Sequence, residues 1–176
     1  TSIAARQVLL SEGQSLANRF KTLDNQLTQI DSQLDGQLAV SITEINVITE
    51  GIAELNAAII NLSTGSGGQP NDLLDQRDEL INRLSEYTSV STLQDDLGAI
   101  SIFVGSGQAL VVGSTQTDLT TITDLSTDPS RLGVGYGPNA IEITAEISGG
   151  SLGGILQVRG EVIDSAKAEL NALATN

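Results

Sequence analysis

A long run of apolar residues at three- and four-residue steps is the feature that most limits the folds open to this chain. The steps run from Phe20 to Leu34 and again from Leu38 to Leu62, and each series is typical of a coiled-coil seam. We therefore predict one helix over about residues 2–62, which would extend for roughly 90 Å. A helix of that length cannot bury its apolar stripe alone, so the sequence predicts partner helices from the same chain or from other subunits.

The seam changes phase between Leu34 and Leu38, where a step of four residues stands in place of three. Such a stutter alters the local winding of a coiled coil. It coincides with Gly36, and glycine weakens a helix interior by about 1 kcal/mol. We expect a bend or local unwinding at Asp35 and Gly36, and a break into two helices is the alternative.

A second helix, over about residues 72–87, is predicted after a flexible Gly- and Ser-rich loop at residues 63–69. Pro70 ends any helix that arrives from the loop, and Asn71 or Asp72 can cap the new one, because a short polar side chain satisfies free N–H groups. We expect this helix to fold back antiparallel on the first. Its opening string is the candidate site of the chain: Asn71, Asp72, Leu73, Leu74, Asp75, Gln76, Arg77 and Asp78.

Residue physics alone gives this string a structural role. Capping and solvation account for every charge in it, since carboxylates are favourable near a helix N-terminus. Replacing Asn71 and Asp72 together by alanine should then cost about 1–2 kcal/mol of stability.

Between residues 88 and 147 the apolar period changes from helical to alternating. Residues 141–147 alternate apolar and polar side chains, which is typical of a half-buried strand. Residues 95–98 and 105–108 are predicted hairpin turns, and residues 128–130 and 137–139 are turn or loop segments. We expect a small, mostly antiparallel β domain of four to six strands. Its other strands centre on Val90, Ile100, Ile102, Val104, Leu110, Val112 and residues 119–123.

A third helix is predicted from residue 148, with Ser151 as its N-cap and a course that returns alongside the first helix. Gly153 and Gly154 would permit close approach to another helix. The fold class is therefore α+β. A helix and its antiparallel return helix occupy residues 1–87, a small β domain occupies residues 88–147, and the third helix occupies residues 148–176. The three helices should form an elongated, coiled-coil-like shaft.

Composition excludes several functional classes. The net charge is −14, from 22 acidic and eight basic residues, so the surface repels nucleic-acid phosphates and anionic lipids. No apolar run reaches the roughly 20 residues that a membrane span needs. The absence of cysteine and histidine excludes cysteine nucleophiles, disulfides, the usual zinc sites and histidine-based triads.

Three other patterns carry residue types that are found in functional sites. The carboxylates of Asp72, Asp75 and Asp78 lie near each other, but a chain with 2% aromatic residues is poorly suited to holding a sugar between them. Asp95 and Asp96 lack the spacing of a calcium loop, so a hairpin turn is expected there. The glycine clusters at residues 133–137 and 149–154 lack phosphate-loop spacing, so a loop or close packing is expected. We predict no enzyme activity, cofactor or metal.

The string from Asn71 to Asp78, continued by Glu79, Leu80 and Ile81, resembles a helix of the flagellar hook-associated protein 1 family. Three further segments resemble that family in the same order. The first is residues 47–62, with Ile45 and Asn46 leading in and Leu55 and Asn56 within. The others are residues 107–113 and residues 149–156 with Arg159.

The resemblance implies a structural subunit of the bacterial flagellum that joins hook to filament. Members of the family are exported unfolded through the flagellar type III pathway, without a cleaved signal, and act outside the cell. Expected partners are copies of the same chain in a ring, the hook protein and the second hook-associated protein, with no nucleic acid and no membrane. The chain starts at Thr1 and both ends fall in helical patterns, so we expect a piece of a longer polypeptide that is monomeric alone. The alternatives are another flagellar axial protein, such as the second junction protein, or a secreted adhesin with a helical stalk.

Overall fold

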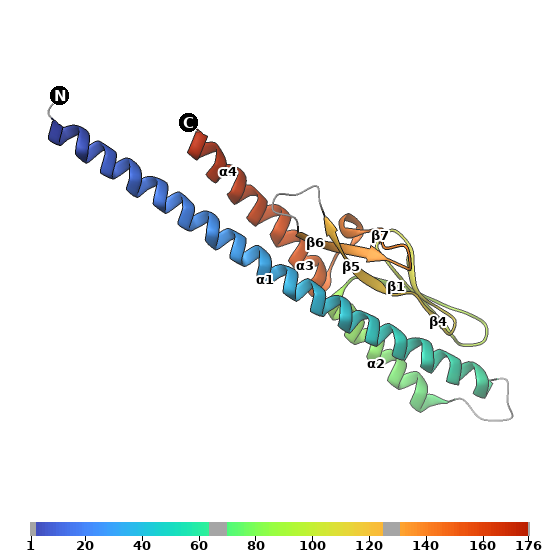
Figure 1. Cartoon of the computed structure of the whole chain (residues 1–176). Helices are drawn as coiled ribbons and strands as arrows, with labels where there is room; N and C mark the ends of the chain where they lie inside the picture. The colour runs from blue at the N-terminus through green and yellow to red at the C-terminus, as the bar shows by residue number, and fades with distance from the viewer. Residues whose placement is uncertain (1–2, 64–69, 125–130, 176) are drawn as a thin grey trace. The chain divides into compact units, whose positions relative to one another are not determined.

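The computed structural model describes residues 3–63, 70–124 and 131–175. Contacts divide the chain into two compact units. One is formed by Thr1–Leu34 with Gln157–Asn176, and the other by Asp35–Leu156. We call them the terminal unit and the central unit. The fold is α+β, as predicted: a long helix and further helices, with small antiparallel sheets inserted between them (Figure 1).

The first helix, α1, runs without interruption from Ile3 to Ser63. The predicted unwinding at Asp35 and Gly36, and the alternative of two helices, are therefore wrong. A side chain at Gly36 would meet no atom within 4 Å. The glycine therefore destabilises the helix only through its low intrinsic helix propensity. That small penalty does not outweigh the cooperativity of a helix whose next turns are packed into a core.

The seam of α1 is buried over most of its central-unit part, which confirms the apolar face predicted there, although Leu62 at its end is 44% exposed. Six seam residues are at most 4% exposed: Leu38, Ile42, Ile45, Ile48, Ile52 and Ile59. At about 25 cal/mol per Å² of apolar surface removed from water, this stripe is the main hydrophobic contribution of α1 to the unit.

Helix α2 (Asn71–Tyr87) packs antiparallel on α1, as predicted (Figure 1). Asn56 of α1 bonds Arg77 of α2, whereas Gly51, one turn earlier in α1, faces Leu80, one turn later in α2. A Cβ on Gly51 would lie 3.0 Å from the Leu80 side chain, so the glycine permits this close helix pair. The predicted loop lies mostly outside the described residues, and Ser63 itself is helical.

The β region forms two antiparallel sheets, with strand orders β1-β2-β3-β4 and β5-β6-β7. Among the described residues there are seven strands, which is more than the four to six predicted. Two of the seven have only two residues each. The strands are β1 (Val90–Gln94), β2 (Ile100–Val104), β3 (Gln108–Val112), β4 (Thr115–Gln116), β5 (Leu119–Asp124), β6 (Arg131–Tyr136) and β7 (Ile141–Glu142).

The strand predicted over residues 141–147 is mostly wrong. Only Ile141–Glu142 pairs with β6, and a 3₁₀ turn, Thr144–Glu146, follows. Ile143 and Ile147 flank this turn and are 3% and 6% exposed. Both are buried without an extended strand between them, so the alternating pattern alone was misleading.

Sequence analysis assigned residues 133–137 to a loop or to close packing, whereas the structure forms strand β6 there. The close packing is confirmed, because a Cβ on Gly135 would lie 2.7 Å from the side chains of Thr120 and Ile122 on β5. Glycine is depleted in strands, so low strand propensity disguised β6 in the sequence. In the structure, glycine is needed there because β6 lies in close contact with β5.

The predicted turns are present where the structure describes them. Gly98 N–H donates to Asp95 O between β1 and β2, and Gly107 N–H donates to Val104 O between β2 and β3. Ala140 N–H donates to Gly137 O before β7. The predicted turn at residues 128–130 lies outside the described residues.

The third helical region comprises α3 (Gly150–Val158), a π-helical segment (Arg159–Ile163) and α4 (Asp164–Thr175). The predicted N-cap at Ser151 is wrong, because the helix already begins at Gly150, where φ is +58°. A side chain on Gly150 would collide with the Tyr87 backbone. Gly153 packs against the backbone of Ser148, not against another helix, and Gly154 faces open space.

Candidate functional site

The candidate string begins α2, but its N-terminus is not capped as predicted. Pro70 is the N-cap residue, and no side-chain cap hydrogen bond is present there. Instead, the N–H groups of Leu73 and Leu74 donate to the Pro70 carbonyl at 3.0 and 3.1 Å. Asn71 already lies inside the helix, so its side chain is displaced from the cap position. The carboxylate of Asp72 still lies in the first turn, near the positive end of the helix dipole.

Arg77 is the one charged residue of the string that is buried, at 2% exposed. Its guanidinium Nη1 donates to Asn56 Oδ1 at 3.1 Å and to the Gly98 carbonyl at 2.6 Å. Arg77 therefore joins α2 to α1 and to the turn between β1 and β2. The interpretation that capping and solvation explain every charge in the string is wrong for this residue.

Burial lowers the pKa of the Arg77 guanidinium by desolvation, and the nearby carboxylates of Asp78 and Asp95 partly oppose this effect. An arginine remains protonated at neutral pH even after such a shift. The site therefore holds a buried positive charge that donates hydrogen bonds to the Asn56 and Gly98 oxygens and is attracted by the carboxylates of Asp78 and Asp95.

Asn56 is fully buried and uses its whole side-chain amide. Its Nδ2 donates to the carbonyls of Ile100 and Gly113 at 2.8 and 2.7 Å. Its Oδ1 accepts from Ile100 N–H and from Arg77, both at 3.1 Å. Asn56 thus bonds the first residue of β2 as a neighbouring strand would, and four hydrogen bonds satisfy the amide completely.

Asn46 repeats this pattern ten residues earlier in α1. Its Nδ2 donates to the Leu119 carbonyl at 2.8 Å, and its Oδ1 accepts from Leu119 N–H at 2.9 Å. Leu119 is the first residue of β5, so in each sheet the first residue of one strand, β2 or β5, is bonded to an asparagine of α1. Asp35 makes a contact of the same kind, since its Oδ1 accepts from Leu132 N–H of β6 at 3.0 Å.

The two asparagines and Arg77 form what we call the anchor set: Asn46, Asn56 and Arg77. Sequence analysis placed Arg77 in the candidate string and quoted both asparagines for the family resemblance, but it assigned none of the three a contact. The available signal was an asparagine on or beside the apolar seam of α1, since an amide at that place must find hydrogen-bond partners when buried.

Asp95 serves its hairpin turn, as predicted. Its Oδ1 accepts from the N–H groups of Leu97 and Ala99 at 2.9 and 2.8 Å. The string carboxylates Asp72, Asp75 and Asp78 are exposed on α2. Across residues 3–63, 70–124 and 131–175, no group of three or more acidic side chains is placed to hold a metal ion. None of the helices in the described part of the chain is both long and apolar enough to cross a bilayer.

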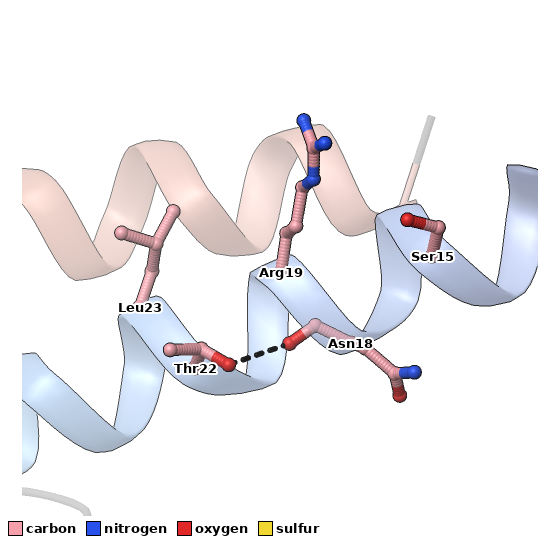
Figure 2. A pocket seen from close by; sticks show the side chains of 5 residues that line it. All are labelled: Ser15, Asn18, Arg19, Thr22 and Leu23. Carbon is pink, nitrogen blue, oxygen red and sulfur yellow. Dashed lines mark hydrogen bonds between the residues drawn. The ribbon is translucent and has the colours of Figure 1, made fainter.

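The terminal unit also carries a hollow on its surface. Ser15, Asn18, Arg19, Thr22 and Leu23 line it, all from α1 (Figure 2). Its one side-chain hydrogen bond runs from the Thr22 hydroxyl to the Asn18 carbonyl at 2.9 Å, within the helix itself. All five residues are exposed. The hollow therefore lacks the converging buried polar groups of a small-molecule site.

The terminal unit instead presents a row of exposed apolar side chains, spaced by seven residues. The row consists of Leu9, Leu16, Leu23 and Ile30, which are 75%, 55%, 49% and 42% exposed. We call it the apolar row. Repetition at seven residues keeps the four side chains on one face of α1, which is the geometry by which helices associate.

The described residues thus form a long helix, further helices, small inserted antiparallel sheets and an exposed apolar row, which is an arrangement suited to packing against other helices. Comparison with known proteins agrees. The model of the flagellar hook-associated protein FlgK helical domain matches residues 1–176. The chain therefore belongs to the flagellar hook-associated protein FlgK family.

Individual relatives support this assignment. The chain is 39% identical to flagellar hook-associated protein 1 of Escherichia coli K12 over 97% of its length, and 26% identical to that of Bacillus subtilis 168 over 90%. Its fold matches the flagellar hook junction protein FlgK from Burkholderia pseudomallei with a TM-score of 0.87, at 34% identity over 98% of the chain. The chain spans 32–34% of the length of these three relatives.

Proposed function

We propose that this chain is the helical part of a structural subunit at the junction between the hook and the filament of a bacterial flagellum, and that it catalyses no reaction. The observation that carries the proposal is the family match over residues 1–176, together with the similarity to the flagellar hook junction protein FlgK from Burkholderia pseudomallei. The absence of histidine and cysteine is consistent with a non-enzymatic role.

We further propose that the subunit works outside the cell after export through the flagellar pathway in an unfolded state, without a cleaved signal. The composition supports this step, because a chain without cysteine or tryptophan has no disulfide to undo and few bulky side chains to repack. Its proposed partners are copies of itself in a ring, the hook protein and the second hook-associated protein.

The apolar row is the surface through which the terminal unit would join other helices. Four exposed apolar side chains at seven-residue spacing need a partner with a matching stripe, since water does not stabilise such a surface. The high negative charge of the chain disfavours irregular association of the same surface.

Deletion of the gene in its source bacterium tests the proposed role. We expect bare hooks under the electron microscope and flagellin monomers in the medium. Normal filaments on the deletion strain would contradict the proposal.

Complementation of that strain then tests the apolar row. The gene would carry Leu16→Ser with Leu23→Ser, and the matched control would carry Gln14→Ser with Lys21→Ser, which are also exposed and seven residues apart. Both pairs introduce the same two serines, so helix propensity after substitution is matched. We expect the control to restore filaments and the leucine pair to fail. Equal restoration by both variants would exclude the row as an assembly surface.

A further inference from the structure

Asp31 lies at the centre of a buried ion-pair cluster in the terminal unit. Its Oδ1 is 3.2 Å from Arg159 Nε, and its Oδ2 is 3.2 Å from Lys167 Nζ. The side chains of Asp31, Arg159 and Lys167 are 5%, 4% and 13% exposed. Removing one member of such a cluster leaves a buried charge without compensation, which is far more costly than losing a surface pair. The cluster therefore fixes which residues of the C-terminal helix face α1.

The two cations lie on either side of an irregularity in the helix. Arg159 begins the π-helical segment, and Asp164 N–H donates to the Arg159 carbonyl five residues earlier, where an α-helix would use the carbonyl of Gly160. A π turn holds about one residue more than an α turn and is rare, because its hydrogen-bond geometry is less favourable. A specific interaction is therefore needed to keep it in place.

The π segment determines the angle between the two cations around the helix axis. Arg159 and Lys167 are eight residues apart. In a regular α-helix, at about 100° per residue, they would point about 80° apart. The extra residue taken up by the π turn reduces this difference to about 20°. Both side chains can then reach the one carboxylate on α1.

We propose that Asp31 holds the π segment, and that Arg159–Ile163 is a conformational device that sets the rotation of α4, with regular α-helix as its alternative state. Without the Asp31 charge, the segment relaxes to α-helix. Residues after it then turn by about 80–100° around the helix axis. This rotation moves Lys167, and the half-buried Leu170 three residues later, away from the face that packs on α1.

The first test replaces the charge of Asp31 in the 176-residue chain. Asp31→Asn keeps the size of the side chain, and Asp24→Asn makes the same charge change at an exposed position of α1. Scalar couplings through hydrogen bonds, measured by NMR, identify the carbonyl that accepts from Asp164 N–H. We expect Arg159 as the acceptor in the original chain and in Asp24→Asn, and Gly160 in Asp31→Asn. Retention of the Arg159 bond in Asp31→Asn would overturn the proposal.

The second test does not depend on whether Asp31→Asn folds. Deleting Gly160 removes the extra residue, so the helix can become regular while both ion pairs remain. Deleting Gly36 is the matched control, because a side chain at either exposed glycine would meet nothing within 4 Å, and Gly36 lies in regular helix. We expect the Gly160 deletion to keep or raise Tm and the Gly36 deletion to lower Tm by several degrees. A loss of Tm for the Gly160 deletion as large as for the control would reject the proposal.

Discussion

The two parts of α1 carry the same apolar spacing and meet opposite surroundings. In the central unit, seam residues such as Ile45 and Ile52 are completely buried. In the terminal unit, Leu9 and Leu16 of the apolar row are more than half exposed. The pattern of residues along a helix therefore fixes which face is apolar, but the neighbouring elements decide whether that face is covered.

The two units also differ in how they satisfy buried polar groups. The central unit uses neutral amides of Asn46 and Asn56 against strand backbone, with Arg77 joined to one of them. The terminal unit uses charges, with Asp31 between two cations. Amide contacts of this kind specify one backbone position, whereas ion pairs fix side chains on two helices relative to each other. We therefore expect the strongest single-residue effects on stability in the central unit.

The largest expected effect follows from Asn56→Ala. The substitution leaves the N–H and carbonyl of Ile100, the Gly113 carbonyl and Arg77 without their partner. Loss of several buried hydrogen bonds should lower the free energy of unfolding by about 4 kcal/mol. Urea titration followed by circular dichroism measures it. Asn82→Ala, at an exposed position of α2, is the control and should change the value by less than about 0.5 kcal/mol. Similar values for the two variants would disprove the anchoring role of Asn56.

A pair of apolar truncations tests the comparison directly. Ile52→Ala removes a completely buried side chain and should cost about 3 kcal/mol, whereas Leu23→Ala, at a 49% exposed position, should cost less than about 0.5 kcal/mol. The same urea titration applies. A large cost at Leu23 would mean that the apolar row is already covered in solution, for example by a second copy of the chain, and the cost would then depend on protein concentration.

Arg77→Lys should have the next largest effect, about 2 kcal/mol, because an ammonium cannot reproduce the geometry of a guanidinium that donates to Asn56 and Gly98. Arg83→Lys, at an exposed position on the same helix, should be nearly neutral. Thermal unfolding of both variants at one protein concentration makes the measurement. Equal melting temperatures for the two would show that the Arg77 contacts contribute little.

The smallest effect is expected for Asn71→Ala combined with Asp72→Ala. Neither side chain caps α2, so the cost of about 1–2 kcal/mol that sequence analysis predicted should not be reached. The remaining loss of the Asp72 carboxylate near the helix dipole is worth about 0.5 kcal/mol. A measured cost above about 1 kcal/mol would revive the capping interpretation. Calorimetric measurement of the free energy of unfolding distinguishes the small dipole cost from the larger capping cost.

Part of the fold was predictable because it depends on local pattern. The helix over residues 3–63, the antiparallel position of α2 and the turns at residues 95–98 and 105–108 each follow from periodicity or from turn chemistry. The candidate string was located, and Arg77 lies in it. The residues of this string carry the resemblance to the hook-associated protein family, and the match of the whole chain to the FlgK family confirms that resemblance.

Other predictions failed where a distant contact outweighed a local preference. Strand β6 was not predicted because Gly133 and Gly135 are poor strand formers. In the structure, these glycines leave room for the side chains of β5. The N-cap at Asn71 failed because the Pro70 carbonyl already receives the first N–H groups of the helix. The π segment has no signature in local composition, since it depends on a carboxylate more than a hundred residues earlier in the chain.

The sequence by itself determined the period of each element, the apolar face of α1, the absence of histidine and cysteine chemistry and the family to which the chain belongs. The tertiary structure alone decided that Asn46 and Asn56 pair with strand residues, that Arg77 is buried and that Asp31 binds two cations. The physical reason is the distance along the sequence over which each kind of interaction acts. Periodicity and turn chemistry act over a few residues, whereas a buried amide or charge is satisfied by whichever groups the folded chain brings to it from far along the sequence.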